Sequence, residues 1–356
     1  MRKSKNNRPY IGERGAPRGA TATQTVPQLA DDQQLSLTQA LEIFVQAKRA
    51  ERVRERTIKE YRLHIKYLIA YMQEEANVET TVANLTPELI RDYITYLLYD
   101  KTTYEGVQGR KNVRVGLSPT TVNIRLRTLK TMCRFWAAEG YARINAMETI
   151  KLVLMDEVEE VQGLSEGDIS LILAAHDERH YAQWRDVTLI YLLLDTGLRI
   201  TEATVLKITD INSIYLEVTV PSKVAKNRKY RDVPISREVL KRLLDLHRES
   251  VEYFGKEAVG DRIFMNAYGE YYTADSFRKR MTRLKKRLGL AKLHPNQFRH
   301  TFARDYLLNG GDLFTLQKIL DHADIKTTRK YVQMDGNHIR DQHAKNTPLR
   351  KYMKRR

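Results

Sequence analysis

Apolar residues recur at intervals of three and four positions through four successive segments in the first 150 residues of the chain. The segments begin at Ser36, Thr57, Pro87 and Ser118, and the last one stops at Gly140. This period places the apolar side chains on one face of a helix, and such faces must be buried against one another. The segment at Ser118 also starts with a capping serine followed by proline, which is a favourable helix start. The pattern predicts a small helical domain over residues 32–150.

Only one stretch of the chain favours β-structure. Residues 215–220 and 230–235 alternate between apolar and polar side chains, and a polar, lysine-rich connection joins them. That arrangement predicts a β-hairpin. Helical patterns surround it, starting at Ser165, so we expect a second domain over residues 164–335. An acidic linker over residues 151–163 would join the two. The predicted fold class is mainly α with a small antiparallel β-hairpin or sheet.

The charge of the chain indicates a polyanionic partner. Lysine and arginine number 61 against 44 acidic residues, a formal net charge of +17. Residues 1–30 carry a net +5 and residues 336–356 a net +6, so the two ends supply most of the excess. Nucleic acid is the simplest partner for such a protein. The other interpretation is a pair of solvated tails: a flexible arm over residues 1–31 and a basic tail over residues 336–356.

Several classes of protein are not expected. The sequence has no apolar run of about 18 residues and no apolar region behind its basic N-terminus, so neither a membrane helix nor a secretory signal is predicted. Its single cysteine, Cys133, excludes an internal disulfide and a multi-cysteine zinc site. We expect a cytoplasmic, nucleoid-associated protein with no membrane partner.

Four separated pieces of the second domain combine into one pattern. They are TGLRITEA at 196–203, the hairpin connection at 222–229, PNQFRHTFA at 295–303 and LDHADIKTTRKY at 320–331. Taken singly, these pieces are also typical of a surface arginine, a solvated turn and a packing tyrosine. In this order and spacing they resemble the tyrosine recombinase (phage integrase) family. The helical domain ahead of them is similar to that family's SAM-like core-binding domain, so the resemblance implies a two-domain, C-shaped DNA clamp.

The resemblance implies a role for each matching residue. Tyr331 would attack the scissile phosphate and form a 3′-phosphotyrosyl bond, which frees a 5′-hydroxyl. Arg199 and Arg299 would bind the non-bridging oxygens, His322 would hydrogen-bond the same phosphate, and Glu202 would steady the site. Guanidinium groups suit phosphate oxygens, and a covalent intermediate conserves the bond energy, so no cofactor, ATP or metal is expected.

Local sequence adds expectations about two of these residues. Gly197 would separate two helices and leave Arg199 at a helix N-terminus, where anions are favoured. Thr327 or Thr328 would cap a further helix that holds Tyr331 in its first turn, where cations and the helix dipole would favour the phenolate.

The general acid is assigned through the family pattern K-x-x-K-x-R-x-V-P. Lys226 stands eight residues before Pro234 and matches its first lysine, so the resemblance implies that Lys226 protonates the leaving 5′-oxygen. Lys223 is the alternative.

One position departs from the family pattern. A histidine is expected three residues before Arg299, and the chain has Asn296 there. His294 and His300 are near but out of register. Asparagine can donate to a phosphate oxygen but cannot accept a proton at pH 7. We therefore predict slower or differently routed proton transfer rather than an inactive enzyme.

Further basic residues are candidates for phosphate contact outside the active site. They lie in the hairpin connection, in a helix predicted over residues 276–289 and in the fourth N-terminal helix: Lys223, Lys229, Arg278, Lys279, Arg283, Lys286, Arg125, Arg127 and Lys130. The expected partner is double-stranded DNA with specific recombination sites, bound by a homotetramer and possible accessory proteins. The basic tail is expected to dock on a neighbouring subunit.

Two other functions stay open at this stage. A protein of the same fold can bind DNA without cutting it, and a topoisomerase-like enzyme shares the chemistry but needs no second duplex. The biological task also stays open among integration, transposition, excision and dimer resolution, with the basic arm favouring a mobile genetic element.

Overall fold

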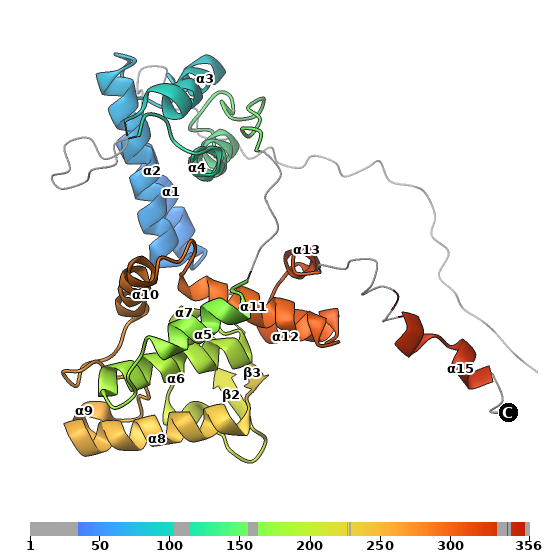
Figure 1. The fold of residues 1–356 in the computed structure, drawn as a ribbon. Coiled ribbons are helices and arrows are strands. Elements are labelled where there is room, and N and C mark those ends of the chain that lie inside the picture. Colours follow the sequence, from blue (N-terminus) through green and yellow to red (C-terminus); the bar gives the residue numbers. More distant parts are fainter. Residues whose placement is uncertain are drawn as a thin grey trace, which may run out of the picture. The chain divides into compact units, whose positions relative to one another are not determined.

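The computed structural model describes residues 35–102, 114–155, 163–225, 227, 229–332, 340 and 343–352. The predicted arm at residues 1–31 and most of the linker lie outside these residues. The chain divides into two compact units at residue 157, and each is considered by itself. Figure 1 shows the helices and strands of both units.

The N-terminal unit is helical, as its apolar periodicity predicts. Its helices are α1 (Leu37–Ala50), α2 (Glu55–Glu74), α3 (Pro87–Thr95) and α4 (Pro119–Ala138), with a π-helical turn, η1 (Tyr96–Asp100), after α3.

Two serines cap helices of this unit, and the cap at Ser118 was predicted. Ser36 and Ser118 accept hydrogen bonds from the first turns of α1 and α4. At the centre of the core, the buried indole of Trp136 donates to the carbonyl of Ala40 at 3.0 Å, which ties α4 to α1. The apolar faces of the four helices therefore do meet in one core.

The C-terminal unit is also mainly helical. Its helical elements are α5 (Glu166–Ala174), α6 (Tyr181–Thr196), α7 (Ile200–Ala203), the 3₁₀ turn η2 (Ile208–Asp210), α8 (Arg237–Phe254), α9 (Lys256–Val259), α10 (Ala274–Leu288), α11 (Pro295–Leu308), α12 (Leu313–Leu320), α13 (Ile325–Arg329) and α15 (Leu349–Tyr352). Helix α6 is buried along most of its length and packs against α8 and α11. Among the described residues, no helix combines the length and apolarity needed to cross a bilayer.

The predicted hairpin belongs to a three-stranded antiparallel sheet. Strand β1 (Ile211–Asn212) pairs with β2 (Glu217–Val220), and β2 pairs with β3 (Arg231–Pro234). Val218 and Val233 are register partners and face the core, whereas Thr219 and Asp232 face solvent and share a hydrogen bond of 2.6 Å. This alternation is the period-2 pattern visible in the sequence. The mainly helical fold with a small sheet is confirmed, and β1 is the strand that the pattern did not predict.

Candidate active site

The glycine between α6 and α7 sets the turn that brings Arg199 to the start of α7. Gly197 ends α6 in the left-handed conformation, with φ +63°. A Cβ there would lie 2.4 Å from the Phe302 ring and 2.7 Å from the Leu320 side chain, so no other residue fits without displacement. The chain then turns into α7, and Arg199 occupies its N-cap position. The predicted break at Gly197 and the place of Arg199 are both confirmed.

Glu202 is a fully buried carboxylate held by two arginines. Its Oε1 lies 2.9 Å from Nη1 of Arg199, and its Oε2 lies 2.8 Å from Nη2 of Arg231. Burial alone would raise the pKa of Glu202, but the hydrogen bonds and charges of Arg231 and Arg199 outweigh it and hold the pKa below its usual value. Glu202 is thus ionised and fixes the direction of the Arg199 guanidinium.

Arg231 was not among the residues expected in the site. It begins β3, and its Nε donates to the carbonyl of Ile319 in α12 at 3.2 Å, so it joins sheet and helix across the site. The sequence did contain a signal for it, because Arg231 falls on the arginine of the K-x-x-K-x-R-x-V-P pattern that begins at Lys226.

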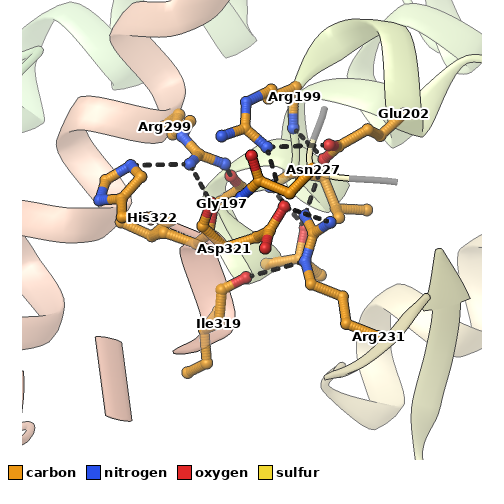
Figure 2. A network of polar contacts seen from close by, with 12 residues as sticks. Gly197, Arg199, Glu202, Asn227, Arg231, Arg299, Ile319, Asp321 and His322 are labelled. Carbon is orange, nitrogen blue, oxygen red and sulfur yellow. Dashed lines mark hydrogen bonds and ion pairs between the residues drawn. The ribbon is translucent and has the colours of Figure 1, made fainter. Parts of the chain in front are cut away.

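Arg299 lies almost completely buried on α11 at the centre of the network (Figure 2). It donates to the carbonyls of Gly197 and Leu320, both at 2.6 Å, and lies 2.9 Å from Nε2 of His322. Burial, together with the charge of Arg199, lowers the pKa of Arg299 to about 10. The group is still a cation at neutral pH, and a bound anion would offset its cost of burial.

The hydrogen bonds of His322 fix its tautomer. A guanidinium can only donate, so Nε2 of His322 accepts from Arg299 and carries no proton. The proton therefore lies on Nδ1, which donates to Oγ1 of the buried Thr328 at 2.9 Å. To hydrogen-bond a phosphate oxygen through Nε2, His322 must gain a proton there and give up its bond from Arg299.

Asp321 is a second acid in the network that sequence reasoning missed. It ends α12 in the left-handed conformation, φ 53° and ψ 51°, which aspartate tolerates better than most residues. Its Oδ2 lies 3.9 Å from Arg199 and 3.9 Å from Arg231. The network therefore contains three arginine side chains and two carboxylates, which leaves an excess of one positive charge. The arginines are Arg199, Arg231 and Arg299, and the carboxylates belong to Glu202 and Asp321. Figure 2 shows these side chains converging.

Tyr331 lies beyond the end of α13, not in the first turn of a helix. Asp324 caps α13, because its Oδ1 accepts from the amide of Lys326 at 2.9 Å, and the helix ends at Arg329. The prediction that Thr327 or Thr328 provides the cap is therefore wrong. The dipole of α13 does not favour the phenolate, because Tyr331 follows its C-terminal end.

The tyrosine hydroxyl is paired with a histidine. Tyr331 packs against Ala303, Leu316 and Leu320, and its Oη lies 2.8 Å from Nδ1 of His300. Burial raises the pKa of Tyr331, and the charges of Arg299 and Arg199 offset this only in part. The cationic neighbours act in the expected direction, but burial outweighs them, so the phenol is protonated at neutral pH in this structure.

The remaining predicted catalytic residues lie at the edge of the site or outside the described part. Lys226, the expected general acid, is outside the described residues. Its neighbour Asn227 donates from Nδ2 to the carbonyl of Asp321 at 3.1 Å, which brings the hairpin connection to the site. Lys223 is exposed. Asn296 is exposed in the first turn of α11, and the structure gives it no hydrogen bond to another described side chain.

The predicted DNA-contact residues of the C-terminal unit lie on α10 and in the hairpin connection. On α10, Phe277, Met281 and Leu284 are buried, and the predicted contact residues of that helix are exposed. The exposed basic residues there and in the hairpin connection are Arg278, Lys279, Arg283, Lys286 and Lys229.

In the N-terminal unit the predicted contact residues differ in exposure. Arg127 on α4 is exposed and Lys130 is half-buried. The guanidinium of Arg125 stacks on the ring of Tyr67, with its carbon 4.1 Å from the ring centroid, so Arg125 is already held by packing.

Guanidinium donors grouped in this way suit a tetrahedral anion such as phosphate. Two family models cover most of the chain: the phage integrase family model matches residues 162–338, and the phage integrase SAM-like domain matches residues 36–152. The chain belongs to the phage integrase family.

Curated relatives in the phage integrase family are tyrosine recombinases, enzymes that cleave and rejoin DNA with a tyrosine nucleophile. Tyrosine recombinase XerC of Thermodesulfovibrio yellowstonii is 28% identical over 241 residues, covering 66% of this chain and 78% of the relative. XerC of Listeria welshimeri is 24% identical over 300 residues, covering 80% of this chain and 96% of the relative.

Solved structures share the fold of this phage integrase family member. The Tn1549 transposon integrase in complex with a circular intermediate DNA has a TM-score of 0.66 at 18% identity, covering 88% of this chain and all of that chain. A lambda integrase dimer bound to a core site has a TM-score of 0.62 at 17% identity, covering 85% of this chain and 80% of that chain.

Proposed function

We propose that this chain is a site-specific tyrosine recombinase in which Tyr331 cleaves and rejoins DNA. One observation carries the proposal: Arg199, Arg299, His322 and Tyr331 come from three separate segments of the sequence and gather around one buried cationic network. Negative charge grows on the phosphate in the transition state, and preorganised guanidinium donors stabilise it. Such donors are often worth about 3 kcal/mol each.

The reaction needs the present contacts of the arginines and His322 to change. Phosphate oxygens would take donors of Arg199 and Arg299 that now bind Glu202 and backbone carbonyls. His322, once protonated at Nε2, would hydrogen-bond the same phosphate. Lys226 would protonate the leaving 5′-oxygen, and the hydrogen bond of Asn227 to Asp321 supports a position of that connection near the site.

Duplex DNA is the proposed substrate, and a tetramer is the proposed assembly. The Tn1549 integrase and lambda integrase structures contain DNA, as does that of the XerH recombinase bound to its difH substrate. The basic arm, the basic tail and the exposed face of α10 supply positive charge for such a partner. Relatives of both kinds, Xer recombinases and a transposon integrase, leave dimer resolution and transposition as the two tasks to compare.

Covalent trapping tests the proposal without knowledge of the recognition sequence. The full-length protein is incubated with a library of nicked duplexes of randomised sequence, and DNA that stays attached in denaturant is sequenced. We expect enrichment of one sequence and attachment at Tyr331 in peptide mapping. Tyr331→Phe should give no adduct; an adduct at another residue would contradict the proposal.

Partner exchange then separates recombination from relaxation. Two duplexes that carry the trapped sequence and different labels are mixed with the protein. A recombinase joins the two labels in one product, whereas a topoisomerase-like enzyme reseals each duplex on itself. A protein that binds the sequence but traps no DNA would be a binding protein only.

A further inference from the structure

The contact between His300 and Tyr331 joins a half-buried imidazole to the proposed nucleophile. The two residues are far apart in the sequence, and their side chains meet at 2.8 Å, with ring centroids 5.6 Å apart. His300 has no counterpart among the roles that the family resemblance implies. Its side chain touches the reacting atom, which makes it a candidate for a direct part in the reaction.

The direction of this hydrogen bond follows from the burial of the phenol. Tyr331 is 5% exposed, and an O–H group left unpaired in such a place costs about 1–3 kcal/mol. Within the described part of the chain, Nδ1 of His300 is the acceptor that the structure offers to this O–H. Tyr331 therefore donates, and His300 holds a lone pair toward the phenolic proton.

His300 is poised as an acceptor across the physiological range. Burial lowers its pKa to about 4, and the charges of His294 and Arg299 on the same helix act in the same direction. The imidazole is neutral near pH 7, so its lone pair is available. Negative charge from a bound phosphate would raise the pKa of His300 at the moment when the phenol must lose its proton.

Helix geometry relates His300 to the position where the family pattern has its histidine. Asn296 and His300 are four residues apart on α11, so they lie on the same face in successive turns. Asn296 is exposed and cannot take a proton at neutral pH. The imidazole of His300 lies one turn further along α11 on the same face, so it can take the place of a histidine at position 296.

We propose that His300 is the proton acceptor for Tyr331, in place of a histidine at position 296. This inference rests on the proposed function. As Oη of Tyr331 forms its bond to phosphorus, the phenolic proton passes to Nδ1 of His300. The P–O5′ bond breaks, and the leaving oxygen takes a proton from the general acid, proposed as Lys226. In rejoining, the 5′-hydroxyl attacks phosphorus and returns its proton to the general acid, and the His300 imidazolium returns its proton to the phenolic oxygen as the phosphotyrosyl bond breaks.

The test separates proton transfer from positioning. In His300→Asn, the amide oxygen can still accept the Tyr331 hydrogen bond near the place of Nδ1, but it cannot take the proton. The substrate is a nicked duplex of the trapped sequence with sulfur replacing the bridging 5′-oxygen. A thiolate leaves without protonation, so this substrate reports on the nucleophile and does not require the general acid.

We expect His300→Asn to form the adduct at least about 100-fold more slowly than wild type on this sulfur substrate. His180→Asn, a change at an exposed histidine outside the site, should stay within about threefold of wild type, and Lys226→Ala should be restored by sulfur. Equal binding in gel shifts and equal thermal unfolding would show that His300→Asn is folded.

Three results would overturn the proposal. His300→Asn at the wild-type rate on both the natural and the sulfur substrate would mean that His300 takes no proton from Tyr331. A faster variant would mean that the contact restrains the nucleophile. A defect that disappears on the sulfur substrate would place His300 on the leaving-group side. If wild type forms no adduct with any duplex, or if Tyr331→Phe still does, the proposed function itself fails together with this inference.

Discussion

At the scale of residues, the site depends on guanidinium groups whose hydrogen bonds are shared between protein and substrate. Arg299 donates hydrogen bonds to two backbone carbonyls and to His322, so it joins three segments before DNA binds. Arg199 and Arg231 do the same through Glu202. Catalysis and folding therefore draw on the same contacts, and substitutions here should affect both.

Replacing Arg231 tests the buried carboxylate. Arg231→Met removes one of two cations that hold Glu202, and breaking a buried ion pair from one side typically costs about 3–5 kcal/mol. Urea unfolding should show a loss of this size, and the double variant Arg231→Met, Glu202→Gln should recover part of it. Arg179→Met breaks a highly exposed pair with Asp177 and should leave the free energy of unfolding nearly unchanged. Equal losses at both sites would contradict the assignment.

The proton equilibrium of His300 predicts a stability change with pH. Its pKa is about 4 in the folded chain against an ordinary value of 6.5, so between these values the unfolded chain binds more protons. Stability is then lost as the pH falls from about 6.5 to about 4, by up to roughly 3 kcal/mol. His300→Asn should lose less over this range in urea unfolding at a series of pH values. An identical pH dependence would show that His300 titrates normally in the folded protein.

At the scale of elements, local sequence predicts helix starts well where a capping residue precedes an apolar period. Ser118 acts as the predicted cap, and Ser36 and Ser165, where helical patterns were expected to begin, also cap their helices. The same logic failed at α13, where two threonines and Asp324 compete within five residues and the aspartate provides the cap. A helix as short as α13 has too few apolar positions for the sequence pattern to show where it begins. The capping residue could therefore not be predicted from the sequence.

The turn between α6 and α7 should tolerate no side chain. Gly197→Ala adds a left-handed alanine and a clash with Phe302, for a cost of roughly 2–4 kcal/mol in thermal or urea unfolding. Gly289→Ala is the matched control, since Gly289 has φ +66° and no atom within 4 Å of the added Cβ. It should cost only about 1–2 kcal/mol. Equal costs would show that the clash relaxes.

At the scale of the whole molecule, the fold class and most site residues could be predicted, because helical periodicity and motif order are properties of the sequence. Sequence reasoning missed two residues of the site, Arg231 and Asp321. It also missed the contact between His300 and Tyr331. Each acts through a partner distant in sequence, such as Glu202 for Arg231 or Tyr331 for His300. Spacing along the chain cannot reveal contacts that arise only when α11, α12 and the sheet pack together.

The basic face of α10 predicts a salt-dependent interaction with duplex DNA. If Lys279, Arg283 and Lys286 contact phosphates, changing each to glutamine should lower the slope of log affinity against log salt by about one. Lys241→Gln on α8 provides an exposed control that should leave the slope unchanged. Binding titrations between about 50 and 200 mM salt would measure this. Unchanged slopes for the α10 variants would remove that helix from the interface.

The left-handed Asp321 gives the unliganded protein an internal counter-ion. Its carboxylate faces Arg199 and Arg231, so the repulsion between these two cations is reduced even without bound DNA. The C-terminal unit can therefore fold with these cations already assembled. A DNA phosphate would have to compete with Asp321 for Arg199 and Arg231. This competition favours duplex DNA, which many other contacts hold in place, over free inorganic phosphate.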